Sequence, residues 1–138
     1  MPILDTVVLF AAADASDKFH NDSLERLREA SKETLVGTFA LIEFDLVLRS
    51  RGSTTEQRSD LMVMLLNYFP KVNSAIHPIS PSTLAIATQL ETRLKLDYFD
   101  ALLASESIEH DGAIVSSDRE FDNIPGLERI ALATRPKR

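Results

Sequence analysis

The chain has 138 residues, of which 44% are hydrophobic and none is cysteine, and its formal net charge is −6. This length is enough for one domain with a substantial core, and the hydrophobic fraction excludes a disordered tail or a fibre. Without cysteine the chain has no disulfide framework, no thiolate metal site and no cysteine nucleophile, which fits a cytoplasmic protein.

The sequence predicts no targeting or membrane segment. No basic residue precedes the first apolar ones, Ile3 and Leu4, so we expect no signal peptide. The longest apolar run, residues 7–13, is far shorter than the roughly 20 residues that span a bilayer. We therefore expect a soluble, cytoplasmic protein without a membrane partner. The acidic net charge does not exclude a nucleic-acid partner, because divalent cations neutralise the carboxylates that gather around them.

Short apolar segments alternate with longer helical patterns along the whole chain. In chain order we predict a strand at 3–4, helices at 7–13 and 18–31, a strand at 34–36, helices at 39–49 and 54–68, a weak strand candidate at 74–77, helices at 80–94 and 97–108, and strands at 113–115 and 127–133. Short strands separated by helices are typical of a parallel α/β sheet with helices on both faces. Nothing marks a linker or a repeat, so residues 1–138 are predicted to form a single domain.

Four acidic residues occupy places where a solvated surface charge is not expected. Asp5 and Asp118 each follow an apolar strand, and the carboxyl ends of parallel strands lie on the same edge of a sheet, where ligands bind. Glu43 is the only charge within an apolar arc of its helix. Asp100 lies at the start of a helix rich in small residues, with Asp97 one turn earlier as the expected N-cap.

Each of these acids also has a purely structural interpretation, as a cap or as a partner in an internal salt bridge. No lysine or arginine falls within the predicted strand ends, however, so converging carboxylates would repel one another and their pKa values would rise. A hard divalent cation removes that repulsion, and oxygen ligands suit Mg²⁺ or Mn²⁺. The three histidines, His20, His77 and His110, show no ligand spacing, which disfavours zinc.

The 39–49 helix is apolar on the side opposite Glu43 as well, where it carries Leu41, Phe44 and Leu48. Such a helix is either deeply buried or shared with another chain. Two rival functions stay open: a metal-binding interaction module without catalysis, and a hydrolase such as a glycosidase, which needs only two carboxylates. Four acids favour a metal site.

Together, four segments resemble the PIN-domain ribonucleases. They are Leu4-Asp5-Thr6, Glu43 within residues 39–49, the DALLA run at 100–104 and the SSDREFD run at 116–122. The small size without an appended domain is most similar to the VapC toxins of VapBC toxin–antitoxin pairs. Val7 departs from the family, which often has a polar residue, commonly asparagine, after the Asp-Thr pair.

The resemblance implies a PIN-like three-layer α/β/α fold with a short-stranded, mainly parallel central sheet. It implies a Mg²⁺- or Mn²⁺-dependent endoribonuclease that cleaves single-stranded RNA, with a VapB-type antitoxin and a second copy of the chain as partners. The alternative is a metal-binding PIN-like interaction module without significant nuclease activity. Thr6 and Ser116 are expected to orient carboxylates or water. The implied catalytic and metal-binding residues are Asp5, Glu43, Asp100 and Asp118, with Asp122 as a further metal ligand.

Overall fold

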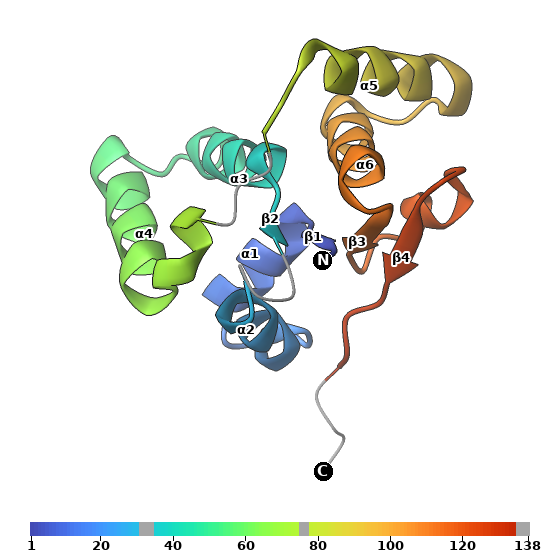
Figure 1. Ribbon diagram of the computed structural model, residues 1–138. Helices are drawn as coiled ribbons and strands as arrows, with labels where there is room; N and C mark the ends of the chain where they lie inside the picture. Colours follow the sequence, from blue (N-terminus) through green and yellow to red (C-terminus); the bar gives the residue numbers. More distant parts are fainter. Residues whose placement is uncertain (31–34, 75–77, 135–138) are drawn as a thin grey trace.

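The computed structural model describes residues 1–30, 35–74 and 78–134 (Figure 1). Its elements in chain order are β1 (Ile3–Leu4), α1 (Thr6–Ala13), α2 (His20–Arg28), β2 (Leu35–Val36), α3 (Thr38–Ser50), α4 (Thr55–Tyr68), the 3₁₀ helix η1 (Pro70–Ser74), α5 (Pro81–Leu94), α6 (Tyr98–His110), β3 (Ala113–Val115), the 3₁₀ helix η2 (Arg119–Asn123) and β4 (Glu128–Ile130). Among the described residues, no helix combines the length and apolar character that a membrane crossing requires.

The four strands found in the described part of the chain form one parallel sheet in the order β2-β1-β3-β4. Ile3 pairs with Leu35 on one side and with Ile114 on the other, so β1 lies at the centre of the sheet. The helices between these strands complete the predicted three-layer α/β/α fold, which is confirmed. All strands run in the same direction, and their carboxyl ends therefore lie on one edge.

Most element boundaries lie within two residues of the predictions, and larger differences occur in three places. The last strand covers only Glu128–Ile130, because the neighbouring β3 offers just three residues for pairing. The helix predicted at 18–31 begins at His20 and ends at Arg28. In the weak strand candidate at 74–77, Ser74 ends η1, and residues 75–77 lie outside the described residues. Ser31, at the end of the helix predicted at 18–31, and Thr34, in the strand predicted at 34–36, also lie outside the described residues.

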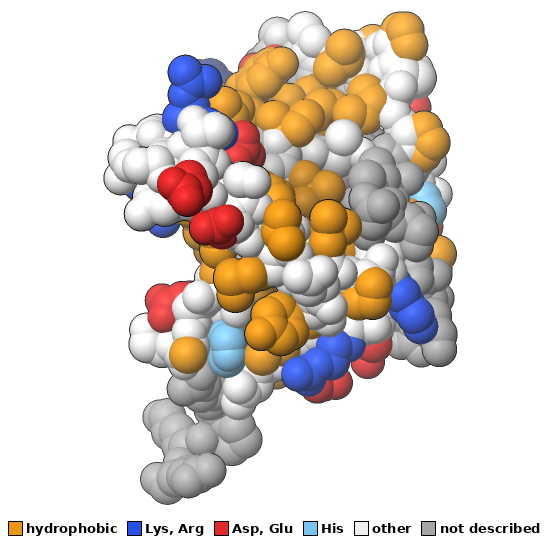
Figure 2. All heavy atoms as spheres, turned by 90° about the vertical axis from the view of Figure 1, so that its left-hand side faces the viewer, with side chains coloured by type: hydrophobic (Ala, Val, Ile, Leu, Met, Phe, Trp, Pro, Cys, Tyr) orange, Lys and Arg blue, Asp and Glu red, His pale blue; other side chains and the backbone are white. Residues whose placement is uncertain are grey.

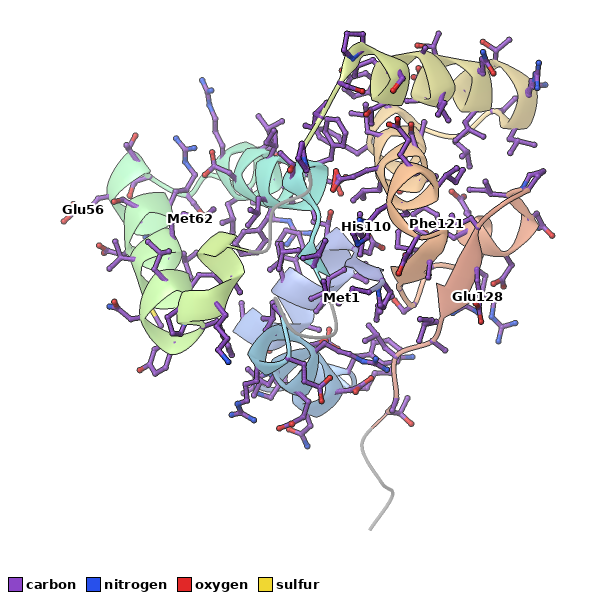
Figure 3. The ribbon with its side chains drawn as sticks, viewed as in Figure 1. Met1, Glu56, Met62, His110, Phe121 and Glu128 are labelled. Atoms are coloured by element: carbon purple, nitrogen blue, oxygen red, sulfur yellow. The ribbon has the colours of Figure 1, made fainter. Side chains whose placement is uncertain are left out.

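The core lies between the sheet and the helices on its two faces. The Phe10 and Phe44 rings meet edge to face with 4.8 Å between their centroids, which joins α1 to α3. In Figure 3, Glu56 and Glu128 point outward at opposite ends of the molecule, whereas the fully buried Phe121 lies inside, beside α6. The small residues of α6 let this helix pack closely against α5, α3 and the sheet.

The structure decides between the two alternatives for α3. Phe44 is only 5% exposed and lies in the chain's own core, with Leu41 and Leu48 packed against that core. Of the two alternatives, this face is therefore buried mainly within the chain itself. Ile42 and Leu46, which belong to the apolar arc around Glu43, are 46% and 44% exposed. Packing of α1 and α4 against α3 decides which side is buried, and the pattern within α3 does not contain that information.

Candidate metal centre

The four acids that the sequence singled out converge on the carboxyl edge of the sheet. Asp5 follows β1 and Asp118 lies just beyond β3, which is the strand beside β1. Asp100 lies in the first turn of α6, and Glu43 lies in the middle of α3. The charges of Glu43 and Asp118 both act on Asp5, and those of Asp97, Asp118 and Asp5 act on Asp100. Residues far apart in the sequence therefore share one electrostatic environment.

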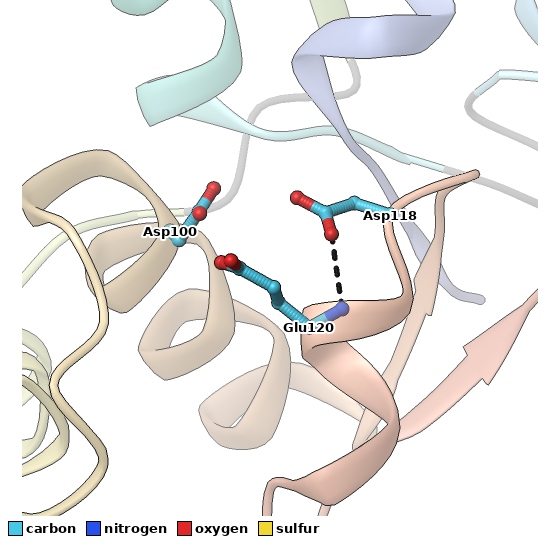
Figure 4. Close-up of side chains that lie close together, drawn as sticks. All are labelled: Asp100, Asp118 and Glu120. Atoms are coloured by element: carbon cyan, nitrogen blue, oxygen red, sulfur yellow. Dashed lines mark hydrogen bonds between the residues drawn. The ribbon is translucent and has the colours of Figure 1, made fainter.

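Three carboxylates lie close enough to bind one cation. Asp100, Asp118 and Glu120 each offer an oxygen, and these oxygens all lie within 4.8 Å of one another. Figure 4 shows the three side chains converging from α6 and from the start of η2. The Asp118 carboxylate also caps η2, because it accepts a hydrogen bond of 2.9 Å from the backbone N–H of Glu120. The same turn thus fixes both Asp118 and Glu120.

Glu120 was not among the predicted site residues. The signal available in the sequence was its position two residues after Asp118, within the acidic run 118–122. Only the 3₁₀ turn of η2 brings its carboxylate back toward Asp100, and sequence patterns do not predict such a turn.

Two hydroxyl groups hold the carboxylates in place. Ser116 Oγ donates a hydrogen bond of 2.6 Å to Asp5 Oδ2, and Ser116 Oγ itself accepts one of 2.9 Å from the backbone N–H of Asp118. Thr6 Oγ1 donates to Glu43 Oε1, while the backbone N–H of Thr6 donates to Asp5 Oδ1 at 2.6 Å. Thr6 and Ser116 therefore connect Asp5 to Glu43 and to Asp118.

Burial and mutual repulsion raise the pKa of three of these acids. Burial raises the pKa of Asp5 to about 6, helped by the charges of Glu43 and Asp118 and opposed by its hydrogen bonds to Ser116 and Thr6. Burial, followed by the charges of Asp97, Asp118 and Asp5, raises the pKa of Asp100 to about 8. The pKa of Glu43 is raised by burial and by the charge of Asp97. Negative charge is thus in excess at this edge.

Asp122 does not join the group of three carboxylates. Arg129 in β4 donates to both of its oxygens, at 2.7 Å from Nε and 3.2 Å from Nη2, and the hydrogen bond from Arg129 lowers the pKa of Asp122. The expectation that no basic residue lies near the strand ends also needs correction, because Arg129 Nη1 donates to the Ser116 carbonyl at 3.0 Å. β4 runs beside β3 and brings Arg129 there.

A further acid, Glu106, is completely buried in the middle of α6 and was also not predicted. Its Oε1 accepts a hydrogen bond of 2.8 Å from the backbone N–H of Thr38, and its Oε2 accepts one of 3.4 Å from that of Phe39. Burial raises the pKa of Glu106 to about 7, although these two hydrogen bonds oppose the rise. The sequence signal was a single charge within an otherwise small and apolar helix segment.

The site fits a divalent cation. Its donors are carboxylate oxygens, which suit Mg²⁺ and Mn²⁺, and three of them are already close enough to share one ion. The pKa values of Asp5 and Asp100 are raised first by burial and then by the neighbouring carboxylates. A cation would relieve that repulsion, and this acidic group can therefore hold a divalent metal.

Comparison with known proteins identifies the family of this domain. The family model described as PIN domain matches residues 3–127, so the chain belongs to the PIN-domain family. No curated protein sequence gives a match.

Solved structures share the fold at low sequence identity. A chain of VapBC2 from Rickettsia felis, bound to a DNA fragment from its promoter, is 21% identical with a TM-score of 0.69, over 94% of this chain and 96% of that one. A chain of FitAB bound to an IR36 DNA fragment is 14% identical with a TM-score of 0.72, over 95% and 94%. A chain of FitAcB from Neisseria gonorrhoeae is 16% identical with a TM-score of 0.65, over 87% and 89%.

Proposed function

We propose that this protein is a Mg²⁺- or Mn²⁺-dependent endoribonuclease that cleaves single-stranded RNA and acts as the toxin of a toxin–antitoxin pair in the cytoplasm. The observation that carries the proposal is the convergence of Asp5, Glu43, Asp100 and Asp118 at one edge of a PIN-domain sheet. The fold is similar to that of a chain of VapBC2, and the sequence resembles the toxins of VapBC toxin–antitoxin pairs. Both similarities support the toxin role.

In this proposal Asp100, Asp118 and Glu120 hold the cation, and Asp5 and Glu43 complete the acidic centre. When bound, the metal would lower the pKa of a coordinated water and stabilise charge developing on the phosphate. Ser116 and Thr6 keep the Asp5 and Glu43 carboxylates oriented toward the site. A carboxylate of this group would accept the proton of the attacking water as a general base.

The proposed activity predicts a strict metal requirement. Purified protein, free of any partner, should cut single-stranded RNA when Mg²⁺ or Mn²⁺ is present and should stop when EDTA is added. Adding back either metal in excess should restore the cleavage, while duplex RNA and single-stranded DNA of the same sequence should stay intact. Cleavage that continues in EDTA would contradict the proposal. Metal binding without any cleavage would favour the interaction-module alternative.

We also propose that an antitoxin helix binds in an apolar groove between α1, α2, α3 and α4. The groove has a volume of about 400 Å³ and is open to solvent along α4. A helix with one apolar face fits such a groove, which is a common mode of peptide recognition. Figure 2 views this side of the molecule and shows exposed apolar side chains spread over it. The apolar side chains that line the groove include Leu9, Leu27, Phe44, Leu61, Leu65 and Phe69.

Two neighbouring residues on α4 allow a matched test of the groove. Met64 lines it, whereas Val63 does not, and both side chains are about half exposed. Met64→Arg should weaken binding of a VapB-type antitoxin by about tenfold or more, because a charge would be desolvated within the interface. Val63→Arg should bind like the parent, and both variants should keep the parent's nuclease activity. Equal affinities for the parent and Met64→Arg, measured by titration calorimetry, would contradict this site.

A homodimer is the last part of the proposal. Ile42 and Leu46 lie one turn apart on α3 and are exposed, and Leu84 on α5 is exposed as well. In Figure 2, apolar side chains gather in the upper part of the view, at the level of α3 and α5. Exposed apolar side chains of this kind are covered when two copies associate through one face. Sedimentation velocity measures the association directly, and a monomer at micromolar concentration would contradict it.

A further inference from the structure

The buried carboxylate of Glu106 connects two helices that both carry acids of the metal centre. It extends from the middle of α6 and accepts hydrogen bonds from the first backbone N–H groups of α3, those of Thr38 and Phe39. The N-cap residue of α3, Gly37, provides no side-chain hydrogen bond of its own. The cap of α3 is therefore supplied by a different helix, across 67 and 68 residues of sequence.

The absence of a side chain at Gly37 leaves room for the Glu106 carboxylate. A Cβ atom at position 37 would lie 2.8 Å from Glu106 Oε1 and 3.0 Å from Ile3 Cγ2, so any side chain there would displace the carboxylate. The backbone of Gly37 has φ −64° and ψ 139°, which other residues adopt easily. Space for Glu106, and not a special backbone conformation, is thus the reason for glycine at this position.

The contact lies at a defined distance from the metal centre along both helices. Glu43 follows Gly37 by six residues on α3, and Asp100 precedes Glu106 by six residues on α6. At 1.5 Å of rise per residue, each separation is about 9 Å. α3 and α6 pack against each other, and Asp97 at the start of α6 acts electrostatically on Glu43. Glu106 therefore joins the two helices about two turns away from the acids that each of them contributes to the centre.

A local cap would have stabilised α3 at lower cost. A serine N-cap satisfies the first N–H groups of a helix without burying a charged group, and burial of a charge is unfavourable unless the group is well paired. What the Glu106 contact adds is a fixed position of α3 relative to α6. The Thr6 hydroxyl orients the Glu43 side chain, but it does not set the position of the helix that carries Glu43.

We propose that Glu106 is a positioning residue of the metal centre. Its carboxylate fixes the start of α3 against α6 and thereby sets Glu43 against Asp100 in the geometry that binds the cation. This inference rests on the proposed function, because it requires that Glu43 belongs to the acidic centre in which Asp100 holds the cation. Glu106 itself touches neither metal nor substrate.

Two substitutions of similar size test the inference through the Mn²⁺ dissociation constant, measured by electron paramagnetic resonance titration of the purified protein. Glu106→Met leaves the Thr38 and Phe39 N–H groups without an acceptor and should weaken Mn²⁺ binding by about tenfold or more, as loss of a group that orients metal ligands typically does. Glu106→Gln keeps the length of the side chain and one acceptor oxygen, so it should bind Mn²⁺ within about threefold of the parent.

Ser105→Ala is the matched control for destabilisation. Ser105 is the adjacent residue on α6, is equally buried and donates a hydrogen bond to the Thr83 carbonyl of α5, away from α3. This variant should lower the melting temperature and leave the Mn²⁺ dissociation constant unchanged. If Ser105→Ala weakens Mn²⁺ binding as much as Glu106→Met does, Glu106 has only a general structural role and the inference is wrong.

A shorter carboxylate covers the case in which Glu106→Met does not fold. Glu106→Asp is one methylene shorter and cannot reach both donors, so it should also weaken Mn²⁺ binding relative to Glu106→Gln. Parent-like Mn²⁺ affinity in Glu106→Met or Glu106→Asp would overturn this inference and leave the metal centre standing. A parent protein that does not bind Mn²⁺ would overturn the metal centre, and the inference with it.

Discussion

Replacing Asp100 by asparagine should lower the rate of metal-dependent RNA cleavage about a hundredfold or more, since groups that act mainly on the transition state have effects of this size. Asp100 interacts with Asp97, Asp118 and Asp5, and one of its oxygens lies within 4.8 Å of those of Asp118 and Glu120. Asparagine has nearly the same shape but lacks the negative charge, so cation binding should be lost while the fold is kept.

Asp100 is a cleaner choice for this experiment than Asp5. The Asp5 carboxylate also accepts hydrogen bonds from the Thr6 N–H at the start of α1 and from Ser116, so its replacement affects local structure as well as charge. The backbone N–H of Asp100 donates a hydrogen bond to the Asp97 carboxylate, which caps α6. This hydrogen bond does not involve the Asp100 side chain, so it is kept in Asp100→Asn.

Asp60→Asn is the matched control for the activity measurement. Asp60 is exposed on α4 and lies outside the acidic group, so the variant removes the same charge from the molecule. Initial rates on one single-stranded RNA at saturating Mn²⁺ should be unchanged in Asp60→Asn and severely reduced in Asp100→Asn. Equal rates in the parent and Asp100→Asn would identify the activity as a contaminating nuclease.

The positions of the acids that follow strands could be predicted from the sequence, because the direction of a strand determines the sheet edge at which the next residue lies. β1 and β3 are parallel neighbours, so Asp5 and Asp118 emerge on the same edge whatever the details of packing. Glu43 could be found for a related reason, because a carboxylate between apolar side chains on a helix needs a polar partner or a charged one. These expectations depend on short-range patterns and on one rule of sheet geometry.

The contacts that sequence reasoning missed connect elements across the fold. Asp122 looked like a ligand, but the pairing of Ile114 with Arg129 brings a guanidinium to it from the last strand. Glu120 joins the site through a 3₁₀ turn, and Glu106 is explained only by the start of α3, which is remote in the sequence. Each assignment needed the relative position of two elements, which no local pattern contains.

The melting temperature of the metal-free protein should fall by about 5 °C or more between pH 5 and pH 8, given that 1 kcal/mol shifts the midpoint of such a domain by several degrees. The pKa of Asp5 is raised to about 6, that of Glu106 to about 7 and that of Asp100 to about 8. In the unfolded chain these groups titrate near pH 4. The folded state therefore binds more protons within this window.

The direction of the effect follows from that difference in bound protons. The stabilisation from each protonated carboxyl is fully present below the unfolded pKa and is lost as the pH rises through the folded pKa. Asp122, whose pKa is lowered, changes its protonation only at more acidic pH and does not alter the trend between pH 5 and pH 8. Thermal unfolding in EDTA, followed by circular dichroism at closely spaced pH values, measures the fall.

Adding Mn²⁺ should reverse this fall, because a cation that binds only the folded state stabilises it and competes with protons for the same oxygens. The increase in melting temperature should therefore be larger at pH 8 than at pH 5. Asp100→Asn should flatten the pH dependence in EDTA, raise the melting temperature at pH 8 and reduce the Mn²⁺ effect, whereas Asp60→Asn, with the same net charge, should follow the parent. A metal-free parent that becomes more stable from pH 5 to pH 8 would show that its acids are paired internally, and the acidic centre would then need no cation.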